Sequence, residues 1–194
     1  MSVFVERLRG RLLAQRAWVL EGRADLRPAG VLVPLVERAA GLHLVLTLRT
    51  QNVEHHKGQV SFPGGGLEPS DEGLAACALR EAREEIGVEG VELIGALDQM
   101  VTNTGFRVAP FVGLLSPDRP YRLEAAEVER VVELPYQALV EGFGRTHVEV
   151  RGHRVETYAI HHDGLLVWGV TGWILRTFLR QTEPDRSFES PSAP

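Results

Sequence analysis

The sequence is poor in cysteine, since Cys77 is the only one among 194 residues. A single thiol excludes an internal disulfide framework and a zinc site of several thiolates. No apolar run approaches the ~18 residues of a membrane span, and the first residues lack the uninterrupted apolar segment of a secretory signal. We therefore expect a cytoplasmic protein with no membrane partner, in which Cys77 is a small core residue.

Positive charge is also in deficit. Lys and Arg number 21 against 26 Asp and Glu, which gives a formal net charge of −5. An acidic chain suits duplex nucleic acid poorly, so we expect no nucleic-acid partner. The charge does not exclude a nucleotide substrate whose own charge is neutralised by bound metal, and the sequence leaves the oligomeric state open.

Length and composition indicate one folded domain, which we place at residues 1–182. Neither an internal repeat nor a break in composition marks a second domain. Apolar residues at steps of three and four predict an N-terminal helix over about 2–21. The polar residues 183–194 predict a disordered tail.

Runs rich in Val and Leu alternate with helical patterns between these ends. The sequence predicts strand-like runs at 31–38, 42–50, 91–102 and 108–116, a hairpin that turns at Gly152, and helices at 133–143 and 165–181. The passage 51–71 is polar and then rich in Gly and Pro. It is too long for a plain turn, which favours a functional loop.

The clearest helix covers residues 71–86. Ser70 or Asp71 can cap its start, because such side chains accept hydrogen bonds from the first free N–H groups. Glu72 suits the positive N-terminal end of the helix, and Gly87 suits its termination.

Three carboxylates share one face of this helix. At about 100° per residue, Glu81, Glu84 and Glu85 fall within an arc of roughly 100°, beside an apolar stripe. Like charges at these spacings destabilise a bare helix by about 0.2–0.5 kcal/mol per pair. A hard divalent cation such as Mg²⁺ reverses that effect, because it binds carboxylate oxygens. The alternative is a solvated acidic face paired with Arg80 and Arg83.

A glycine-rich stretch leads into the helix. Consecutive Gly64, Gly65 and Gly66 let the backbone approach a ligand closely and turn its N–H groups toward an anion. The start of the following helix adds a positive field. These glycines are therefore candidates for contact with substrate phosphates, and the alternative is a flexible turn.

Together the glycines and the helix resemble a known motif. Its matching residues are Gly66, Glu72 and Arg80-Glu81-Ala82-Arg83-Glu84-Glu85-Ile86-Gly87-Val88. Their spacing resembles that of the Nudix box, and only Ala82 departs from it, where the family usually has a larger aliphatic residue. The resemblance implies an α/β/α sandwich with a mixed central sheet and a loop–helix–loop catalytic motif.

The same resemblance implies the chemistry. Nudix enzymes hydrolyse a nucleoside diphosphate linked to another moiety, using Mg²⁺ or Mn²⁺ as cofactor. It implies that Glu81, Glu84 and Glu85 bind the metal and that Glu85 is a candidate base for the attacking water. It also favours a pair between Glu72 and Arg80 that braces the motif, with Gly87 as a further structural residue of the box.

Residues before the box resemble the extension of the coenzyme A pyrophosphatase subfamily. The matching segments are 46–50 and 58–65, with further similarity at 105–113, at Tyr158 and at 168–172. Glu54 is a charge reversal, because the subfamily has Arg there; His55, His56 and Lys57 lie close by. The resemblance implies cleavage of coenzyme A to 3′,5′-ADP and 4′-phosphopantetheine.

A long anionic substrate needs local positive charge in an acidic protein. Arg49, Lys57 and Arg107 are the candidate substrate-binding cations, and the alternative is that they are ordinary surface charges. Phe62 can stack on adenine or pack in the core, and we favour the core. Glu127 is our candidate for a further catalytic carboxylate from a later segment, against the alternative of an exposed acidic stretch.

Two other functions stay open from the sequence. One is a Nudix pyrophosphatase that acts on ADP-ribose or on nucleoside triphosphates, which the reversed charge at Glu54 favours. The other is a binding module that keeps the Nudix fold without catalysis. The intact carboxylates of the box argue against this second alternative.

Overall fold

The computed structural model of the chain describes residues 2–14, 17–20, 22–50, 58–150 and 152–186. The helices are α1 (Val3–Ala14), α2 (Leu74–Ile86), α3 (Tyr136–Gly142) and α4 (Gly169–Thr182). The strands are β1 (Arg27–Arg38), β2 (Gly41–Arg49), β3 (Val60–Ser61), β4 (Gly64–Gly66), β5 (Glu92–Ala96), β6 (Met100–Val101), β7 (Phe106–Leu114), β8 (Val128–Pro135), β9 (Gly144–Val150), β10 (His153–His162) and β11 (Leu165–Val167). None of the helices in these ranges combines the length and apolarity that a membrane crossing needs.

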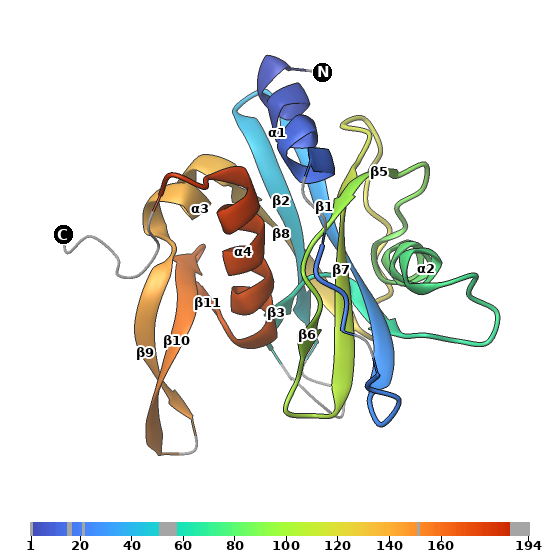
Figure 1. Cartoon of the computed structure of the whole chain (residues 1–194). Coiled ribbons are helices and arrows are strands. Elements are labelled where there is room, and N and C mark those ends of the chain that lie inside the picture. Colours follow the sequence, from blue (N-terminus) through green and yellow to red (C-terminus); the bar gives the residue numbers. More distant parts are fainter. Residues whose placement is uncertain (1, 15–16, 21, 51–57, 151, 187–194) are drawn as a thin grey trace.

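Eight of the described strands form a mixed sheet. Its main path runs β3-β2-β1-β7-β5, while β4 pairs with β1, β6 with β7 and β8 with β2. Strands β1 and β7 are parallel, and the other pairs of this sheet are antiparallel. A separate antiparallel sheet of β9, β10 and β11 lies on the α4 side of the mixed sheet (Figure 1).

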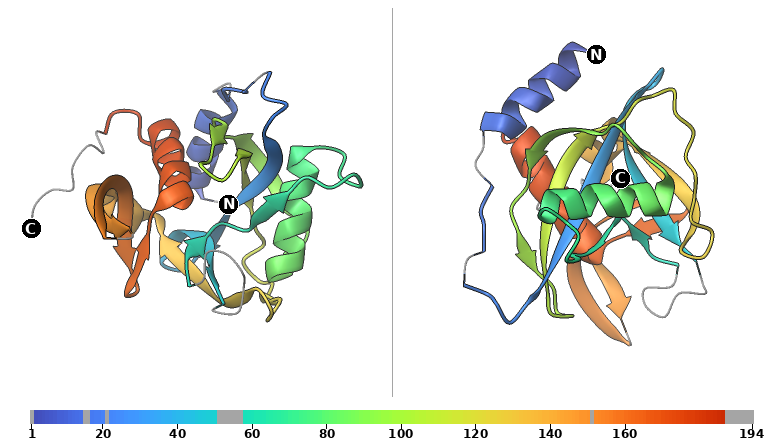
Figure 2. Two further views of the ribbon diagram at one scale, coloured as in Figure 1. Left: turned by 90° about the horizontal axis from the view of Figure 1, so that it is seen from below. Right: turned by 90° about the vertical axis from the view of Figure 1, so that its right-hand side faces the viewer.

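Helices cover both faces of the mixed sheet. Figure 2 shows α2 lying across one face, while α4 and α1 lie on the other. Successive side chains of a strand point to opposite faces, so Leu32 and Val36 of β1 pack on the α2 side and Val33 and Leu35 pack on the α4 side. The predicted α/β/α sandwich with a mixed central sheet is confirmed.

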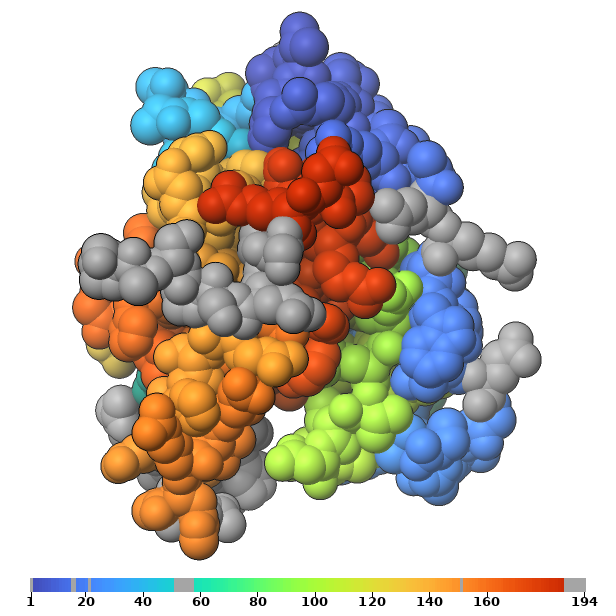
Figure 3. Space-filling model, turned by 60° about the vertical axis from the view of Figure 1, so that its left-hand side comes forward, coloured from blue at the N-terminus to red at the C-terminus, as the bar shows by residue number. Residues whose placement is uncertain are grey.

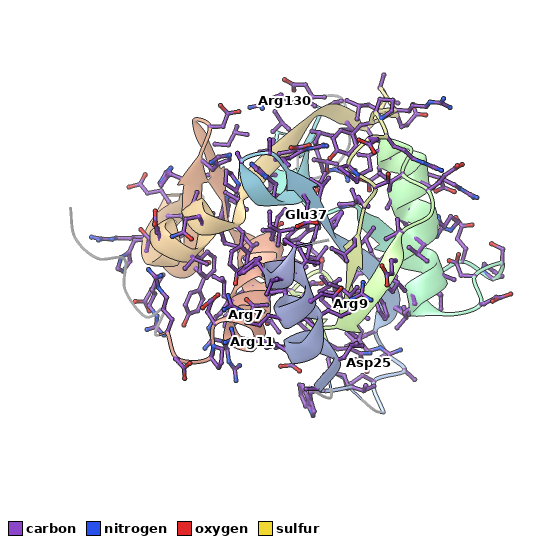
Figure 4. All side chains as sticks on the ribbon, turned by 90° about the horizontal axis from the view of Figure 1, so that it is seen from above. Arg7, Arg9, Arg11, Asp25, Glu37 and Arg130 are labelled. Carbon is purple, nitrogen blue, oxygen red and sulfur yellow. The ribbon has the colours of Figure 1, made fainter. Side chains whose placement is uncertain are left out.

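Two arginines of α1 hold it to its neighbours. Arg9 Nη1 lies 2.8 Å from Glu92 Oε1 of β5. Arg11 donates a hydrogen bond from Nη1 to the carbonyl oxygen of Thr182 at the end of α4. Figure 4 labels both arginines on α1. These contacts join α1 to β5 and to the C-terminal end of α4.

The helix predicted over 2–21 is shorter in the structure, because α1 ends at Ala14. Beyond it, Trp18 is extended and bonds to the chain next to β5. Its N–H donates to Asp98 Oδ1 at 2.8 Å, and its carbonyl accepts from Gln99 N at 3.0 Å. These backbone groups find partners across the fold instead of within a helix.

Two other predicted helices begin later in the structure, because their first residues belong to strands. Residues 165–167 of the predicted closing helix form β11, because they pair with β10 before α4 begins. The predicted helix at 133–143 starts only at Tyr136, since the residues before it belong to β8. The predicted hairpin at Gly152 joins β9 and β10 and projects beside α4 (Figures 1 and 3).

The start of the predicted tail is anchored. Glu183 accepts a hydrogen bond of 2.7 Å from the Tyr136 hydroxyl. Residues 187–194 lie outside the described residues, so the structure does not test that part of the prediction.

Candidate active site

Small residues seat α2 closely on the sheet. Ala78 and Ala82 are fully buried and pack on Leu32 of β1. A Cβ atom added to Gly30 would lie 2.3 Å from the carbonyl oxygen of Leu74, so only glycine fits beneath the helix there. The small Ala82 therefore suits a position where the helix backbone approaches the strand.

The glycine stretch forms strand β4 and brings its backbone against the acidic face of α2. Gly64 N donates to Glu85 Oε1 at 3.3 Å. A Cβ atom added to Gly65 would lie 2.4 Å from Glu81 Oε1. Cys77 is fully buried beside this strand, and its Sγ lies 3.5 Å from the Gly65 carbonyl. The glycines thus hold the carboxylates in place, and their contact with substrate stays a prediction.

The three predicted metal carboxylates differ in environment. The side chain of Glu84 is 54% exposed and that of Glu81 is 18% exposed, whereas residue Glu85 is only 4% exposed. Arg80 Nη1 donates to both Glu81 Oε1 and Glu84 Oε2, at 2.9 Å each. Glu85 Oε2 is buried and has no hydrogen-bond partner among the residues that the structure describes. Within the described ranges, no three His, Cys, Asp or Glu side chains converge to enclose a metal ion.

Burial dominates the protonation equilibria of the two inner carboxylates. It raises the pKa of Glu85 to about 7, an effect that the Gly64 N–H and the charge of Arg49 oppose. It also raises the pKa of Glu81, where Arg80 is the main opposing influence. Both carboxyl groups therefore ionise less readily than those of free glutamates. Added positive charge would favour their ionised forms.

Arg80 is the centre of the motif, and its main partner differs from the prediction. Its guanidinium binds Asp71 through two hydrogen bonds of 3.0 and 3.1 Å. Glu72 is exposed and is not a partner of Arg80, so the predicted Glu72–Arg80 pair is wrong. Asp71 also accepts from Glu68 N at 2.8 Å. It does not cap α2, because that helix begins after Gly73 with no side-chain cap.

The C-terminal end of α2 matches the expectation. Gly87 is the C-cap in the left-handed conformation, with φ of 69°. Its N–H donates to the carbonyl of Arg83 at 3.0 Å. This conformation favours glycine, which explains the glycine at this point of the motif.

The segment 124–127 lies against the C-terminal half of α2. Glu124 N donates to the carbonyl of Glu85 at 3.0 Å, and Thr50 N donates to the carbonyl of Glu127 at 2.9 Å. The segment is thus fixed between the helix and the end of β2. It places Glu127 Oε2 3.5 Å from Arg49 Nη2, and the charge of Glu127 reaches Glu85, whose pKa it raises.

The remaining predicted residues divide in three ways. Arg107 Nη1 donates to the carbonyl of Leu20 at 3.0 Å, and no described contact joins it to the carboxylates. Phe62 is 4% exposed and belongs to the core, as we favoured. Lys57, with Glu54, His55 and His56, lies outside the described residues.

The sequence did not predict that Asp71 is the partner of Arg80. It also did not predict that Gly30 allows β1 to approach the backbone of α2 closely. Asp71 and Arg80 are nine positions apart across a turn, so no helical or strand period links them. Gly30 lies beside an apolar run and belongs to no recognisable sequence motif. Its close approach to the helix shows only when β1 and α2 are packed together.

Sequence comparison finds related proteins over most of the chain. The family model of the NUDIX domain matches residues 26–147. The chain is 36% identical over 182 residues to the "Uncharacterized Nudix hydrolase NudL" of Cronobacter sakazakii, covering 91% of this chain and 94% of that one. It is 39% identical over 160 residues to the protein of the same description from an Enterobacter species, covering 80% and 82% of the two chains.

Solved structures support the fold alone, because their sequences are distant. The MutT protein of Methanosarcina mazei Go1 aligns with a TM-score of 0.54 and 16% identity, over 87% of this chain and all (100%) of that one. A MutT/nudix family protein from Enterococcus faecalis aligns with a TM-score of 0.54 and 18% identity, over 98% and 73% of the two chains.

Proposed function

This chain belongs to the Nudix hydrolase family, whose members cleave phosphorus-containing acid anhydrides, and on that premise we propose that its substrate is coenzyme A. The products would be 3′,5′-ADP and 4′-phosphopantetheine. The observation that supports this proposal is the position of Arg49, a residue of the upstream extension, which pairs with Glu127 and whose charge reaches Glu85 of the box.

The two halves of the extension are one structural unit. Thr47 pairs with Ser61 and Leu48 with Val60 across β2 and β3, and Arg49 N donates to the Gln59 carbonyl at 3.0 Å. The second half then runs directly into β4 and the acidic face of α2. An extension that is joined to the catalytic motif in this way is placed to select the group attached to the diphosphate.

Glu81, Glu84 and Glu85 are the residues that would hold Mg²⁺ or Mn²⁺. Two observations fit a cation there: Glu81 and Glu84 already share one positive partner, Arg80 Nη1, and the buried Glu85 Oε2 has no partner in the described part of the chain. All three offer the hard oxygen donors that these ions prefer. When bound, such an ion supplies the positive charge that neutralises the diphosphate oxygens.

The carboxylates also supply proton transfer. Glu85 is the proposed acceptor for the proton of the attacking water, because its buried Oε2 has no hydrogen-bond partner among the described residues. Glu84 and Glu127 complete the proposed catalytic set, and Glu127 is half exposed and held by Arg49. Arg49 thus has two roles: it orients Glu127 and it brings positive charge toward a diphosphate.

Product analysis in ¹⁸O-labelled water tests the proposal. Purified protein with Mg²⁺ or Mn²⁺ is given coenzyme A, ADP-ribose and deoxynucleoside triphosphates in parallel, and kcat/KM is measured for each. We expect the highest value for coenzyme A, and mass spectrometry should find ¹⁸O in one of the two predicted products. A coenzyme A value far below that of ADP-ribose or the triphosphates would contradict this substrate and favour the alternative.

A further inference from the structure

A cavity of about 550 Å³ opens beyond the C-terminal end of α2. One wall is formed by Arg83, Glu84 and Gly87, and the other by the segment 119–124. Glu84 belongs both to this wall and to the proposed metal carboxylates. The cavity therefore adjoins the proposed metal carboxylates through Glu84, and its other lining residues have no role assigned above.

The acidic side chains around the cavity are already engaged. Glu84 accepts from Arg80 at 2.9 Å, and Glu89 lies 3.6 Å from Arg119. Glu124 Oε1 accepts from the backbone N–H of Ala126 at 3.2 Å. Glu84 and Glu89 thus each lie beside an arginine, and Glu124 is held by a backbone N–H.

Arg83 and Arg122 are different. Both are exposed and line the cavity, and among residues 2–14, 17–20, 22–50, 58–150 and 152–186 neither has an acidic or hydrogen-bonding side-chain partner. Two arginines therefore line one hollow, Arg83 from α2 and Arg122 from the segment 119–124. A guanidinium group binds phosphate oxygens well, because its planar fork donates two parallel hydrogen bonds.

The position of Arg122 is fixed by the end of the helix. Its N–H donates to the carbonyl of Ile86 at 3.0 Å. A Cβ atom added to Gly87 would lie 2.6 Å from Arg122 Cβ, so the missing side chain of Gly87 makes room for this arginine. The glycine of the motif thus ends the helix and also seats Arg122. Beside it, Leu123 is 37% exposed and offers an apolar surface.

We propose that this cavity is a subsite for a phosphate monoester, in which Arg83 and Arg122 bind a second phosphate of the substrate whose diphosphate lies on the α2 carboxylates. The inference rests on the proposed function, since coenzyme A carries such a phosphate on its ribose, next to the cleaved diphosphate. At 1.5 Å per residue, Glu81 and Gly87 are about 9 Å apart along the helix axis. That separation lies within the reach of a single nucleotide.

Binding of the product nucleotide tests the subsite without turnover. Calorimetry with Mg²⁺ measures the Kd of 3′,5′-ADP and of 5′-AMP, which differ only in the 3′-phosphate. We expect the native protein to prefer 3′,5′-ADP by about tenfold, equivalent to about 1.4 kcal/mol. The preference should fall several-fold in Arg83→Gln and Arg122→Gln and vanish in the double variant. Arg154→Gln, at an exposed arginine of β10, is the matched control and should keep the full preference.

Turnover separates this inference from the proposed function. The native protein and the variants are given coenzyme A and 3′-dephospho-coenzyme A, and the ratio of the two kcat/KM values is compared. We expect both Gln variants to lower the ratio. If the native protein hydrolyses coenzyme A but shows no 3′-phosphate preference, or if the variants retain it, the subsite is wrong and the proposed function stands.

The opposite result is equally clear. If the native protein does not hydrolyse coenzyme A but still prefers 3′,5′-ADP through Arg83 and Arg122, the proposed function fails and the subsite stands. Arg83 lies on the solvent side of α2, so its substitution is not expected to disturb folding even if that of Arg122 does. Arg83→Lys keeps the charge and should retain part of the preference, which a role in folding alone would not predict.

Discussion

On the α4 side of the central sheet, large apolar side chains form one continuous core. Fully buried residues from four elements meet there, namely Leu12, Leu35, Leu44, Leu175 and Phe178. On the α2 side the apolar contacts are divided into two small clusters, one around Leu32 and the other around Ile86. The helix there rests on alanines and on a glycine, with carboxylates along its edge.

This difference indicates a division between stability and chemistry. Small residues on the α2 side give up apolar burial but let the backbone of β4 reach Glu81 and Glu85. Burial of a carboxylate oxygen that lacks a partner costs folding free energy, and Glu85 Oε2 is such an oxygen within the described ranges. The continuous core on the other face offsets that cost, so substitutions on the two faces should fail in different ways.

The largest expected effect is on activity, from Glu85→Gln. The substitution keeps the size of the side chain but removes the charge that would bind a cation and the proposed proton acceptor. We expect kcat to fall by about 10²–10⁴-fold. The unfolding midpoint in urea should not fall, because an amide is easier to bury than a carboxylate.

Glu149→Gln, at an exposed position of β9, is the matched control and should leave kcat unchanged. If Glu85→Gln retained nearly full activity, the assignment of the acidic face of α2 as the catalytic centre would be wrong.

On the opposite face, Leu175→Ala should affect stability and spare chemistry. Leu175 is fully buried in the continuous core, and truncation of such a leucine costs about 2–5 kcal/mol of unfolding free energy. Urea denaturation followed by circular dichroism measures this loss, while kcat per folded molecule should be unchanged. Val170→Ala on the same helix is the control, since Val170 is 38% exposed and should cost less than about 0.5 kcal/mol. A specific loss of kcat in Leu175→Ala would contradict the division between the faces.

A smaller effect on activity is expected from Gly65→Ala. The new Cβ atom would lie 2.4 Å from Glu81 Oε1, so the carboxylate must move. A displacement of about 1 Å at a catalytic group can cost about 10²-fold in rate. Gly10→Ala, at an exposed position of α1, is the control, because a Cβ atom there meets nothing within 4 Å and the backbone does not need a positive φ. Equal activities for the two variants would show that the packing of Glu81 on β4 is not needed.

The sequence predicted the parts of the fold that rest on local periodicity. Runs rich in Val and Leu predicted β1 and β2, and the helical wheel of α2 placed the three glutamates on one face. The predicted start of α2 was wrong, because Asp71 does not cap the helix. Its carboxylate accepts hydrogen bonds from Arg80 and from Glu68 N. Strand β8 was not predicted, since its charged residues Glu129, Arg130 and Glu133 interrupt the apolar pattern.

The site was predictable only where a motif with fixed spacing carried it. The three glutamates of the box follow from the sequence, as does the termination of the helix at Gly87. The contacts that join distant segments do not, and the pairing of Arg49 with Glu127 is an example, because it depends on β2 and the segment before β8 lying side by side. Such contacts require the packed sheet.

The smallest expected effect is the dependence of stability on pH that comes from Asp71. Arg80 lowers the pKa of this carboxyl below its unfolded value, which is about 3.9. The ionised pair therefore stabilises the fold above that unfolded pKa, and the contribution is lost as the pH falls through the lower pKa of the folded state. Asp71→Asn should remove this part of the pH dependence, and urea unfolding between about pH 3 and pH 6 measures it.

Asp25 provides the comparison for this last effect. Arg23 lowers the pKa of Asp25 in the same direction, but the Asp25 side chain is 64% exposed, whereas that of Asp71 is 4% exposed. Exposed ion pairs contribute little because water and salt screen them. Asp25→Asn should therefore leave the pH dependence of unfolding almost unchanged, and added salt should weaken the contribution of Asp25 more than that of Asp71. Equal effects of the two substitutions would mean that the Asp71–Arg80 pair is no more than a surface contact and does not brace the motif.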